Sequence, residues 1–208
     1  MKIIEINNFS NSYLLLSKKL NILIDASNDL KAEKIIQEIN KNKIKKLDYI
    51  IITHAHSDHI KGLYSVLSFF EFKPKVLCHE FERKYVEGIK FIERNFLEKI
   101  FRPKIKKVYA EGIIEERLKI SKNIEIIHTP GHTDGSISVY VKNFCIFVGD
   151  LLIRNKFGNV DISDEINSDI DLIKESIKKI LNFDFKKIYF GHGKSGNKKE
   201  VKNFYKNF

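Results

Sequence analysis

The stretch Tyr49-Ile50-Ile51-Ile52-Thr53-His54-Ala55-His56-Ser57-Asp58-His59 decides the fold of this chain and most of its candidate chemistry. Its first four residues are apolar and mostly β-branched, which predicts a strand buried on both faces. Four side chains that can bind metals follow where that strand ends. Residues two apart in extended backbone point to the same side, so His54 and His56 are expected together, with Asp58 and His59 turning back over them. The stretch therefore predicts a metal site at the end of an inner strand.

The composition predicts one domain. The chain has 208 residues, of which 43% are hydrophobic, and this is enough for a sizeable core. No linker rich in Pro, Gly or Ser divides it, so we expect a single domain over residues 1–208. A signal-peptide region and apolar runs of roughly 18 residues are absent, so we expect a cytoplasmic protein with no membrane partner. Cys78 and Cys145 lie in apolar runs and are expected to be buried, reduced thiols.

The charge is basic but spread along the chain. A net charge of +10 comes from 37 Lys and Arg residues against 27 Asp and Glu residues. The lysines form no single arm or stripe, which is more typical of a solvated, ion-paired surface than of a nucleic-acid interface. We therefore expect a small-molecule substrate and no nucleic-acid partner. No feature of the sequence fixes an oligomeric state.

Apolar periodicity and turn residues predict the elements along the chain. Strands are predicted at 3–6, 12–17, 21–26, 48–53, 75–78, 106–110, 116–120, 123–128, 136–142, 144–149 and 187–190. Helices are predicted at 28–41, 60–70, from Phe81 to about Ile100 before Arg102-Pro103, from Asn167 or Ser168 to Leu181, and at 198–205. Strand, helix and strand recur in both halves. This suggests the α/β class, with two sheets facing each other and covered by helices.

Three more candidate ligands follow predicted strands. His132 comes after Thr129-Pro130-Gly131, where Pro-Gly forces a turn. Asp150 and His192 each follow an apolar run that ends in glycine, a residue that lets the backbone approach a bulky centre closely. Because all three share this position with the first four donors, we expect the seven side chains to form one metal site.

Seven donors exceed what one structural zinc takes, so two metals fit better. Two Zn²⁺ bring +4, while Asp58, Asp150 and one hydroxide bring −3. The resulting charge of about +1 can hold an anionic transition state. In two-metal sites one carboxylate can bridge the ions, and the bound water ionises near neutral pH. Two Zn²⁺ are the expected cofactors, with Fe or Mn as alternatives at one or both sites.

These motifs, together with Gly131-His132-Thr133, Gly149-Asp150 and Gly191-His192-Gly193, resemble the metallo-β-lactamase-fold hydrolase superfamily, and within it the glyoxalase II-like branch. The resemblance covers nearly the whole chain. It implies a four-layer αββα sandwich of two facing mixed sheets flanked by helices. It also implies a distribution of ligands, in which Asp150 bridges the two metals. The first metal is held by His54, His56 and His132, and the second by Asp58, His59 and His192.

The resemblance implies a dinuclear zinc-dependent hydrolase. A metal-bridging hydroxide would attack the carbonyl of a thioester, ester or lactone, with Asp58 and Asp150 as the catalytic carboxylates. Asp150 argues against true β-lactamases of the kind that have cysteine at this position. Arg154, Lys156 and Lys194 follow the ligands closely and are candidates to bind a substrate carboxylate.

Three alternatives stay open. The first is a mononuclear iron persulfide dioxygenase, a similar branch that would use two His and one Asp as a facial triad. The second is a phosphodiesterase or nuclease of the same fold, although the chain shows neither an exosite arm nor additional histidine motifs. The third is a non-catalytic module that binds metals or anions. The triad of the first alternative would be His54, His132 and Asp150.

Overall fold

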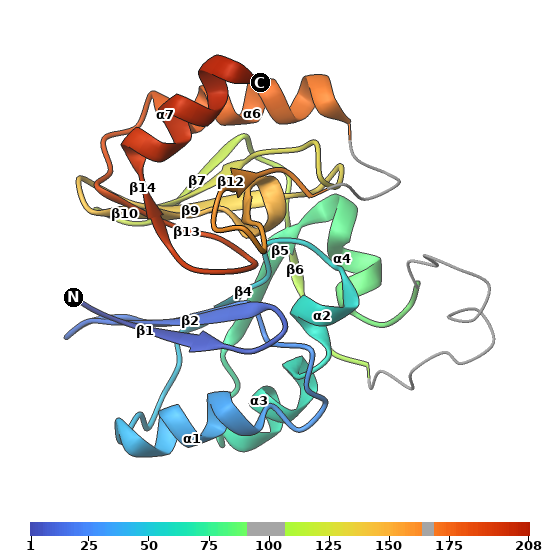
Figure 1. Ribbon diagram of the computed structural model, residues 1–208. Coiled ribbons are helices and arrows are strands. Elements are labelled where there is room, and N and C mark those ends of the chain that lie inside the picture. Colours follow the sequence, from blue (N-terminus) through green and yellow to red (C-terminus); the bar gives the residue numbers. More distant parts are fainter. Residues whose placement is uncertain (91–106, 164–168) are drawn as a thin grey trace. The chain divides into compact units, whose positions relative to one another are not determined.

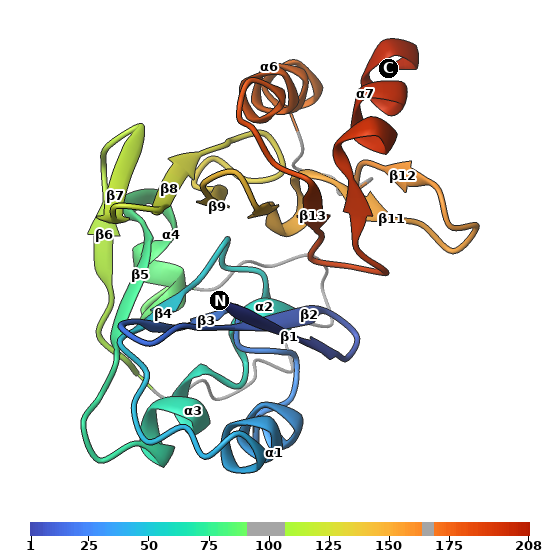
Figure 2. The ribbon, with the colours of Figure 1, turned by 90° about the vertical axis from the view of Figure 1, so that its left-hand side faces the viewer.

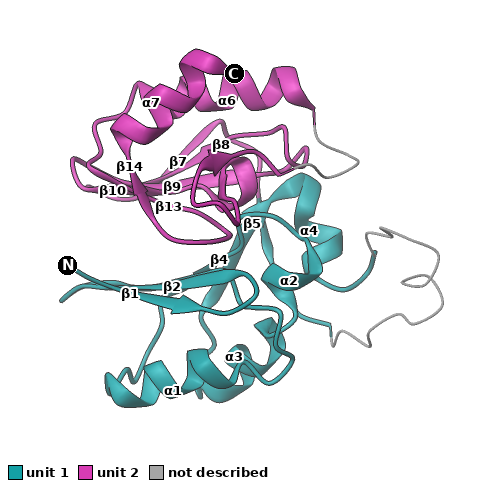
Figure 3. Cartoon of the chain, viewed as in Figure 1, with its two compact units in different colours: residues 1–112 teal, residues 113–208 magenta. Residues whose placement is uncertain are grey.

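The computed structural model describes residues 1–90, 107–163 and 169–208. The chain divides into two compact units, Met1–Gly112 and Ile113–Phe208, which are coloured separately in Figure 3. Each unit is built on a six-stranded mixed sheet that carries helices. The predicted α/β class, with two mixed sheets and flanking helices, is confirmed. A single domain over residues 1–208 stays a prediction.

The sheet of unit 1 has the strand order β1-β2-β3-β4-β5-β6. Strands β1 to β3 pair antiparallel, whereas β3, β4 and β5 pair parallel. Parallel neighbours end at the same edge of a sheet, so the segments after β3 and β4 emerge side by side. The strands are β1 (Lys2–Asn7), β2 (Asn11–Leu16), β3 (Asn21–Ile24), β4 (Tyr49–Ile51), β5 (Lys75–His79) and β6 (Glu111–Ile113).

The helices of unit 1 are α1 (Glu33–Lys41), α2 (Ser57–Ile60), α3 (Leu63–Phe69) and α4 (Glu80–Val86). Figures 1 and 2 both show α1 and α3 on one face of the sheet. Their apolar stripes, with Ile35 and Ile39 on α1 and Val66 on α3, bury against Ile50 and Ile52 in one core cluster. Burial of such side chains stabilises a fold by about 1.5–3 kcal/mol each, so this face anchors the inner strand that precedes the histidines.

Two predicted helices of unit 1 have different bounds. The helix expected over 28–41 begins at Glu33, because Ala32 is left-handed at φ 51° and the Asp29 carboxylate accepts from the backbone N–H of Glu33. The helix expected over 60–70 is two helices, α2 and α3. They part near Gly62, where a Cβ would lie 2.3 Å from the carbonyl oxygen of Ala26. This close approach decides where the chain turns.

The long helix expected from Phe81 to Ile100 is confirmed as far as Val86 and is wrong over residues 87–90. Helix α4 ends at Val86, and Gly88 then adopts a φ of 71°. The rest of that prediction, residues 91–106, lies outside the described residues. The strand expected over 106–110 is also wrong, because residues 107–110 form no strand and pairing begins at Glu111.

The sheet of unit 2 has the order β14-β13-β10-β9-β8-β7. It is mixed, because β10 pairs parallel with β13 while the other neighbouring strands pair antiparallel. A two-stranded hairpin, β11–β12, lies outside it. The strands are β7 (Arg117–Ser121), β8 (Ile124–His128), β9 (Ile137–Val141), β10 (Cys145–Phe147), β11 (Ile153–Arg154), β12 (Val160–Asp161), β13 (Lys187–Tyr189) and β14 (Gly196–Asn197).

Helices α6 (Ile170–Leu181) and α7 (Lys198–Asn207) cover one face of this sheet (Figure 1). Ile173, Ile177 and Val201 join Ile146 and Ile188 of the inner strands in a second core cluster. The predicted inner strands and both helices are confirmed, whereas β11, β12 and β14 were not expected. The N-cap of α6 is Asp169, not the expected residue 167 or 168, because its carboxylate accepts from two backbone N–H groups of the first turn. No helix within residues 1–90, 107–163 and 169–208 has both the length and the apolar character that a bilayer crossing requires.

Candidate metal centre

Unit 1 brings four predicted donors together at the end of β4. His54 and His56 follow the strand, and Asp58 and His59 lie in the single turn of α2. The exposed fractions of all four are between 0% and 6%. The ring centroids of His54 and His56 are 4.7 Å apart, and those of His54 and His59 are 4.2 Å apart. Oδ2 of Asp58 lies 3.5 Å from Nε2 of His59. The turn therefore brings Asp58 and His59 back beside the first histidines, as the sequence predicted, whereas their role as ligands stays a prediction.

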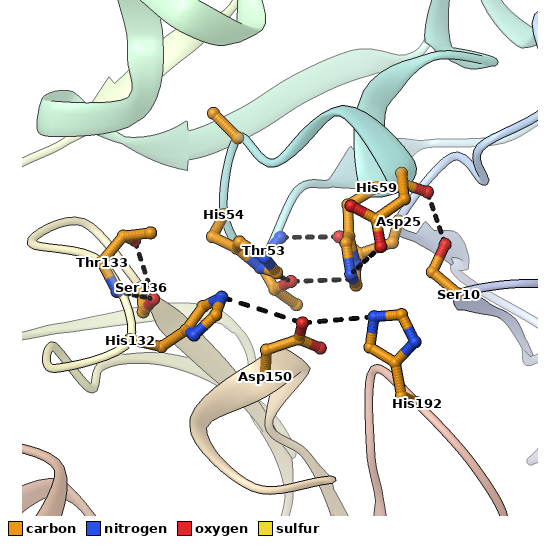
Figure 4. A network of polar contacts seen from close by, with 12 residues as sticks. Ser10, Asp25, Thr53, His54, His59, His132, Thr133, Ser136, Asp150 and His192 are labelled. Carbon is orange, nitrogen blue, oxygen red and sulfur yellow. Dashed lines mark hydrogen bonds and ion pairs between the residues drawn. The ribbon is translucent and has the colours of Figure 1, made fainter. Parts of the chain in front are cut away.

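Asp25, directly after β3, organises these donors from one side (Figure 4). Its Oδ1 accepts from the backbone N–H of Thr53 at 2.8 Å, and its Oδ2 accepts from the Thr53 hydroxyl at 2.8 Å. The same Oδ2 lies 2.9 Å from Nδ1 of His59. Asp25 is 1% exposed and left-handed at φ 58°, a conformation that aspartate tolerates better than most residues. One buried carboxylate thus contacts both the strand end and a candidate ligand.

These hydrogen bonds determine which nitrogen of each imidazole carries the proton. The one hydroxyl hydrogen of Thr53 goes to Asp25, so Thr53 Oγ1 accepts at its 3.1 Å contact with Nδ1 of His54. Nδ1 of His54 is therefore protonated, and Nδ1 of His59 donates to the carboxylate of Asp25. In a neutral imidazole the other nitrogen, Nε2, then has the lone pair. Both Nε2 atoms are set up as metal ligands.

Two further side chains hold the backbone of the donor segment. Glu82 on α4 is 4% exposed, and its Oε2 accepts from the N–H of Ala55, between the first two histidines, at 2.8 Å. The Ser10 hydroxyl, in the turn between β1 and β2, donates to the carbonyl oxygen of Asp58. Sequence reasoning identified neither contact. The role of Asp25 could have been predicted, because Asp25 follows β3, a strand that ends beside β4. Glu82 lies on a helix 27 positions after Ala55, and no pattern in the sequence near Glu82 indicates their contact.

Unit 2 presents the other three donors at the ends of its strands. His132 lies in the turn between β8 and β9, Asp150 in the 3₁₀ turn η1 (Gly149–Leu151) after β10, and His192 after β13. The backbone before His132 is tightly enclosed, since a Cβ on Gly131 would lie 2.5 Å from the backbone nitrogen of Ile173. Gly131 also has a φ of 132°. Glycine is therefore needed to place His132, as the Pro-Gly turn predicted.

One oxygen of Asp150 lies between two imidazoles (Figure 4). Its Oδ2 is 3.3 Å from Nε2 of His192 and 3.7 Å from Nε2 of His132. Asp150 and His132 are 3% and 0% exposed, while the side chain of His192 is 24% exposed. A carboxylate that meets one nitrogen of each of two histidines is suited to bridge ions held by them. His192 is the most accessible of the three.

The chemistry of the donors fits divalent metals. Imidazole nitrogens and carboxylate oxygens are ligands that Zn²⁺, Fe²⁺ and Mn²⁺ accept. Buried carboxylates such as Asp58 and Asp150, 6% and 3% exposed, are normally paired or bound to a metal. Among the residues that the structure describes, the side chains grouped so that they could hold a metal are His54, His56, Asp58 and His59 in unit 1, and His132, Asp150 and His192 in unit 2.

The two cysteines are not part of this chemistry. Both are free and buried. Burial, followed by the negative charge of Glu82, raises the pKa of the Cys78 thiol far above its usual range. Burial also raises the pKa of Cys145 to about 12. Metals bind the thiolate form, so neither thiol is suited to be a ligand. The prediction of buried reduced thiols is confirmed, because both cysteines are free and buried.

The three basic residues proposed to bind substrate lie in different settings. Lys156 and Lys194 are exposed, and the ammonium group of Lys156 lies 5.1 Å from the centre of the Phe157 ring. The side chain of Arg154 is 12% exposed and donates to acceptors within unit 2. Substrate contact by these residues stays a prediction.

Comparison with known proteins agrees with these features. A model of the metallo-beta-lactamase superfamily matches residues 7–192. A probable metallo-hydrolase from Methanocaldococcus jannaschii is 36% identical over 196 residues, which cover 91% of this chain and 90% of that protein. Hydroxyacylglutathione hydrolase 1 from Vibrio vulnificus is 29% identical over 184 residues, which cover 86% of this chain and 60% of that enzyme. Among solved structures, the BLEG-1 B3 metallo-beta-lactamase has a TM-score of 0.76 and 26% identity, covering 97% of this chain and 96% of the other.

Proposed function

This chain belongs to the metallo-beta-lactamase superfamily, and from that membership we propose that it is a dinuclear zinc-dependent hydrolase of small molecules. Its substrate bond is a thioester, or a related ester or lactone bond. The probable metallo-hydrolase and the hydroxyacylglutathione hydrolase among its relatives support hydrolysis and, for the second, a thioester. This chain spans 60% of the length of that second relative. We therefore extend to this chain the type of bond that is hydrolysed, and not the identity of the acyl group.

The observation that carries the proposal is the position of the Asp150 carboxylate. One of its oxygens faces Nε2 of both His132 and His192, at 3.7 Å and 3.3 Å. A carboxylate oxygen that faces a nitrogen of each of two histidines can bridge two ions, one held by each histidine. We therefore assign Asp150 as the bridging ligand. The first metal would be held by His54, His56 and His132, and the second by Asp58, His59 and His192.

When bound, the two zinc ions would polarise the scissile carbonyl and supply a nucleophile from water near neutral pH. The residues of this chain prepare that chemistry. Asp25 keeps the Nε2 lone pair of His59 available, and through Thr53 it does the same for His54. Exposed Lys156 and Lys194 would attract a substrate that carries a carboxylate, in the proposed substrate-binding role.

The test starts with the metal content of the full-length protein purified without added chelator. We expect two zinc ions per chain and turnover of at least one substrate from a panel of acyl-glutathione thioesters, lactones and aryl esters. His192→Ala should lose at least about 100-fold in turnover. The matched control is His128→Ala, which removes a histidine bound to Glu116 and to the carbonyl oxygen of Asp134 and should keep the metals.

Two results would contradict the proposal. The first is a protein with two zinc ions that leaves the whole panel untouched. The second is a protein with one iron per chain and persulfide-dependent oxygen uptake, which would assign it to the dioxygenase chemistry instead.

A further inference from the structure

The side chain of Arg154 is bound into the loop that follows His192. Its Nε donates to the carbonyl oxygen of Lys194 at 3.2 Å, and one Nη donates to the carbonyl oxygen of Ser195 at 3.2 Å. The other Nη donates to the carbonyl oxygen of Gly158 at 3.0 Å and to a carboxylate oxygen of Glu200 at 2.9 Å. Four of the five N–H groups of this guanidinium therefore have acceptors in the protein.

The backbone of Arg154 reaches the candidate ligand itself. Its N–H donates to the carbonyl oxygen of His192 at 3.0 Å. The next residue, Gly193, has a φ of 77°, and a Cβ there would lie 2.5 Å from Cβ of Arg154 and 2.6 Å from its carbonyl oxygen. The chain after His192 is thus pressed against Arg154 at a distance that only glycine allows.

Glu200 extends this contact to helix α7. Its other carboxylate oxygen accepts from the N–H of Asn197, and the side chain of Asn197 accepts from the N–H of Glu200, which forms a capping box. The guanidinium also lies over the ring of Phe190, 5.4 Å from its centre. The segment from Phe190 to Glu200, with His192 inside it, is therefore held at its two ends and in the middle by one side chain.

We propose that Arg154 is a positioning residue for His192, and that it serves the metal site through the loop and not by touching the substrate. A planar guanidinium donates in several fixed directions at once, which a lysine ammonium on a flexible stem does not reproduce. His192 is the most exposed of the three donors of unit 2 and lies on a loop, so its orientation depends most on such support. This inference rests on the proposed function, in which His192 is a ligand of the second metal.

The experiment is a stepwise zinc titration of the full-length protein against a chromophoric chelator. In Arg154→Met we expect one of the two binding steps to weaken by about 10–100-fold, the usual effect of removing support from a ligand. The other step should stay within about twofold of the wild type. Arg154→Lys should give an intermediate loss. The matched control is Lys156→Met, which removes a neighbouring cation from the same hairpin and should leave both steps unchanged.

A purely structural role is tested by Glu200→Gln. This variant removes the charge that Arg154 contacts on α7 but leaves its carbonyl acceptors in the loop. If Glu200→Gln weakened the same zinc step as much as Arg154→Met, the effect would come from α7 and the inference would be overturned. If Arg154→Met fails to fold, Arg154→Lys decides, and unchanged zinc affinities in it overturn the inference. A wild-type protein with no metal at His192 would overturn the proposed function and this inference together, whereas two normal metals in both Arg154 variants would overturn this inference alone.

Discussion

Oδ2 of Asp25 lies 2.9 Å from Nδ1 of His59, and the same oxygen accepts from the Thr53 hydroxyl at 2.8 Å. One carboxylate oxygen therefore governs the tautomer of His59 directly and that of His54 through Thr53. A neutral histidine has one ring nitrogen that carries a proton and one whose lone pair can bind a metal. Because Nδ1 carries the proton in both residues, the lone pair is on Nε2. Asp25 contributes to a metal site that it does not need to touch.

Asp25→Asn is expected to weaken metal binding by about 10–100-fold. Asparagine has the same shape and tolerates the left-handed φ of 58° at this position. Its amide nitrogen, however, must face either the N–H of Thr53 or the Nδ1 of His59, and both donate to Asp25. Competition with a chelator measures the affinity.

The matched control is Asp29→Asn. The Asp29 carboxylate accepts from the backbone N–H groups of Lys31 and Glu33, in the turn before α1. This variant should lose at most about 1 kcal/mol in the free energy of unfolding, because one of the two acceptor oxygens becomes an amide nitrogen. Its metal affinity should not change. Equal affinities in Asp25→Asn and the wild type would disprove the role given to Asp25.

Glu82→Ala is expected to reduce the free energy of unfolding by about 1–3 kcal/mol, because it leaves the N–H of Ala55 without its buried acceptor. The same change should weaken metal binding, since Ala55 lies between His54 and His56. Glu82→Gln keeps an acceptor oxygen and should recover most of both losses. Urea unfolding and zinc titration are the measurements.

Glu80→Ala on the same helix provides the comparison. Glu80 forms a partly exposed ion pair with Arg83 at 2.9 Å, and such pairs contribute up to about 1 kcal/mol. A loss of metal affinity in Glu80→Ala as large as in Glu82→Ala would mean that α4 as a whole, and not the contact to Ala55, supports the site.

The candidate metal donors could be located from the sequence because an apolar strand precedes each group of them. The strand from Tyr49 to Ile51 ends just before the histidines, and the runs before Asp150 and His192 are equally clear. The local pattern of apolar residues shows where each strand ends, and the residues just after that end lie at the edge of the sheet.

The residues that hold the donors were harder to predict, because their contacts join distant parts of the sequence. Glu82 meets Ala55 across 27 positions, and Arg154 meets Glu200 across 46. A contact between residues that are far apart in the sequence forms only in the folded chain, so it produces no periodic pattern along the sequence. For the same reason the break at Gly62 was not expected, because it depends on the carbonyl oxygen of Ala26.

The two thiols are expected to resist labelling in the folded protein. At pH 8 a thiol whose pKa burial has raised to about 12, as for Cys145, holds almost no thiolate. Cys78 is buried too, and its pKa is raised further by the negative charge of Glu82. Ellman's reagent should therefore react with neither thiol in the native protein and with both in urea. Rapid labelling of the native protein would show that one of them is accessible.

Glu200 is expected to make stability depend on pH in the acidic range. The hydrogen bond from Arg154 is the largest cause that lowers the pKa of Glu200 below its usual 4.5, and the N–H of Asn197 lowers it further. A folded pKa below the unfolded one gives stability above pH 4.5, which is lost as the pH falls through the folded value. The side chain is 37% exposed, so the contribution should be at most about 1 kcal/mol.

The measurement is the difference in the free energy of unfolding between the wild type and Glu200→Gln, from urea curves at pH 3 to 7. We expect this difference to be largest near neutral pH and to shrink below pH 4.5. Glu175→Gln, which removes an exposed carboxylate from α6, controls for the loss of a surface charge. In an Arg154→Met background the pH-dependent part should become smaller, because the main cause of the lowered pKa is gone and only the N–H of Asn197 still lowers it. An undiminished pH dependence in that background would show that the capping box, and not Arg154, stabilises the Glu200 carboxylate.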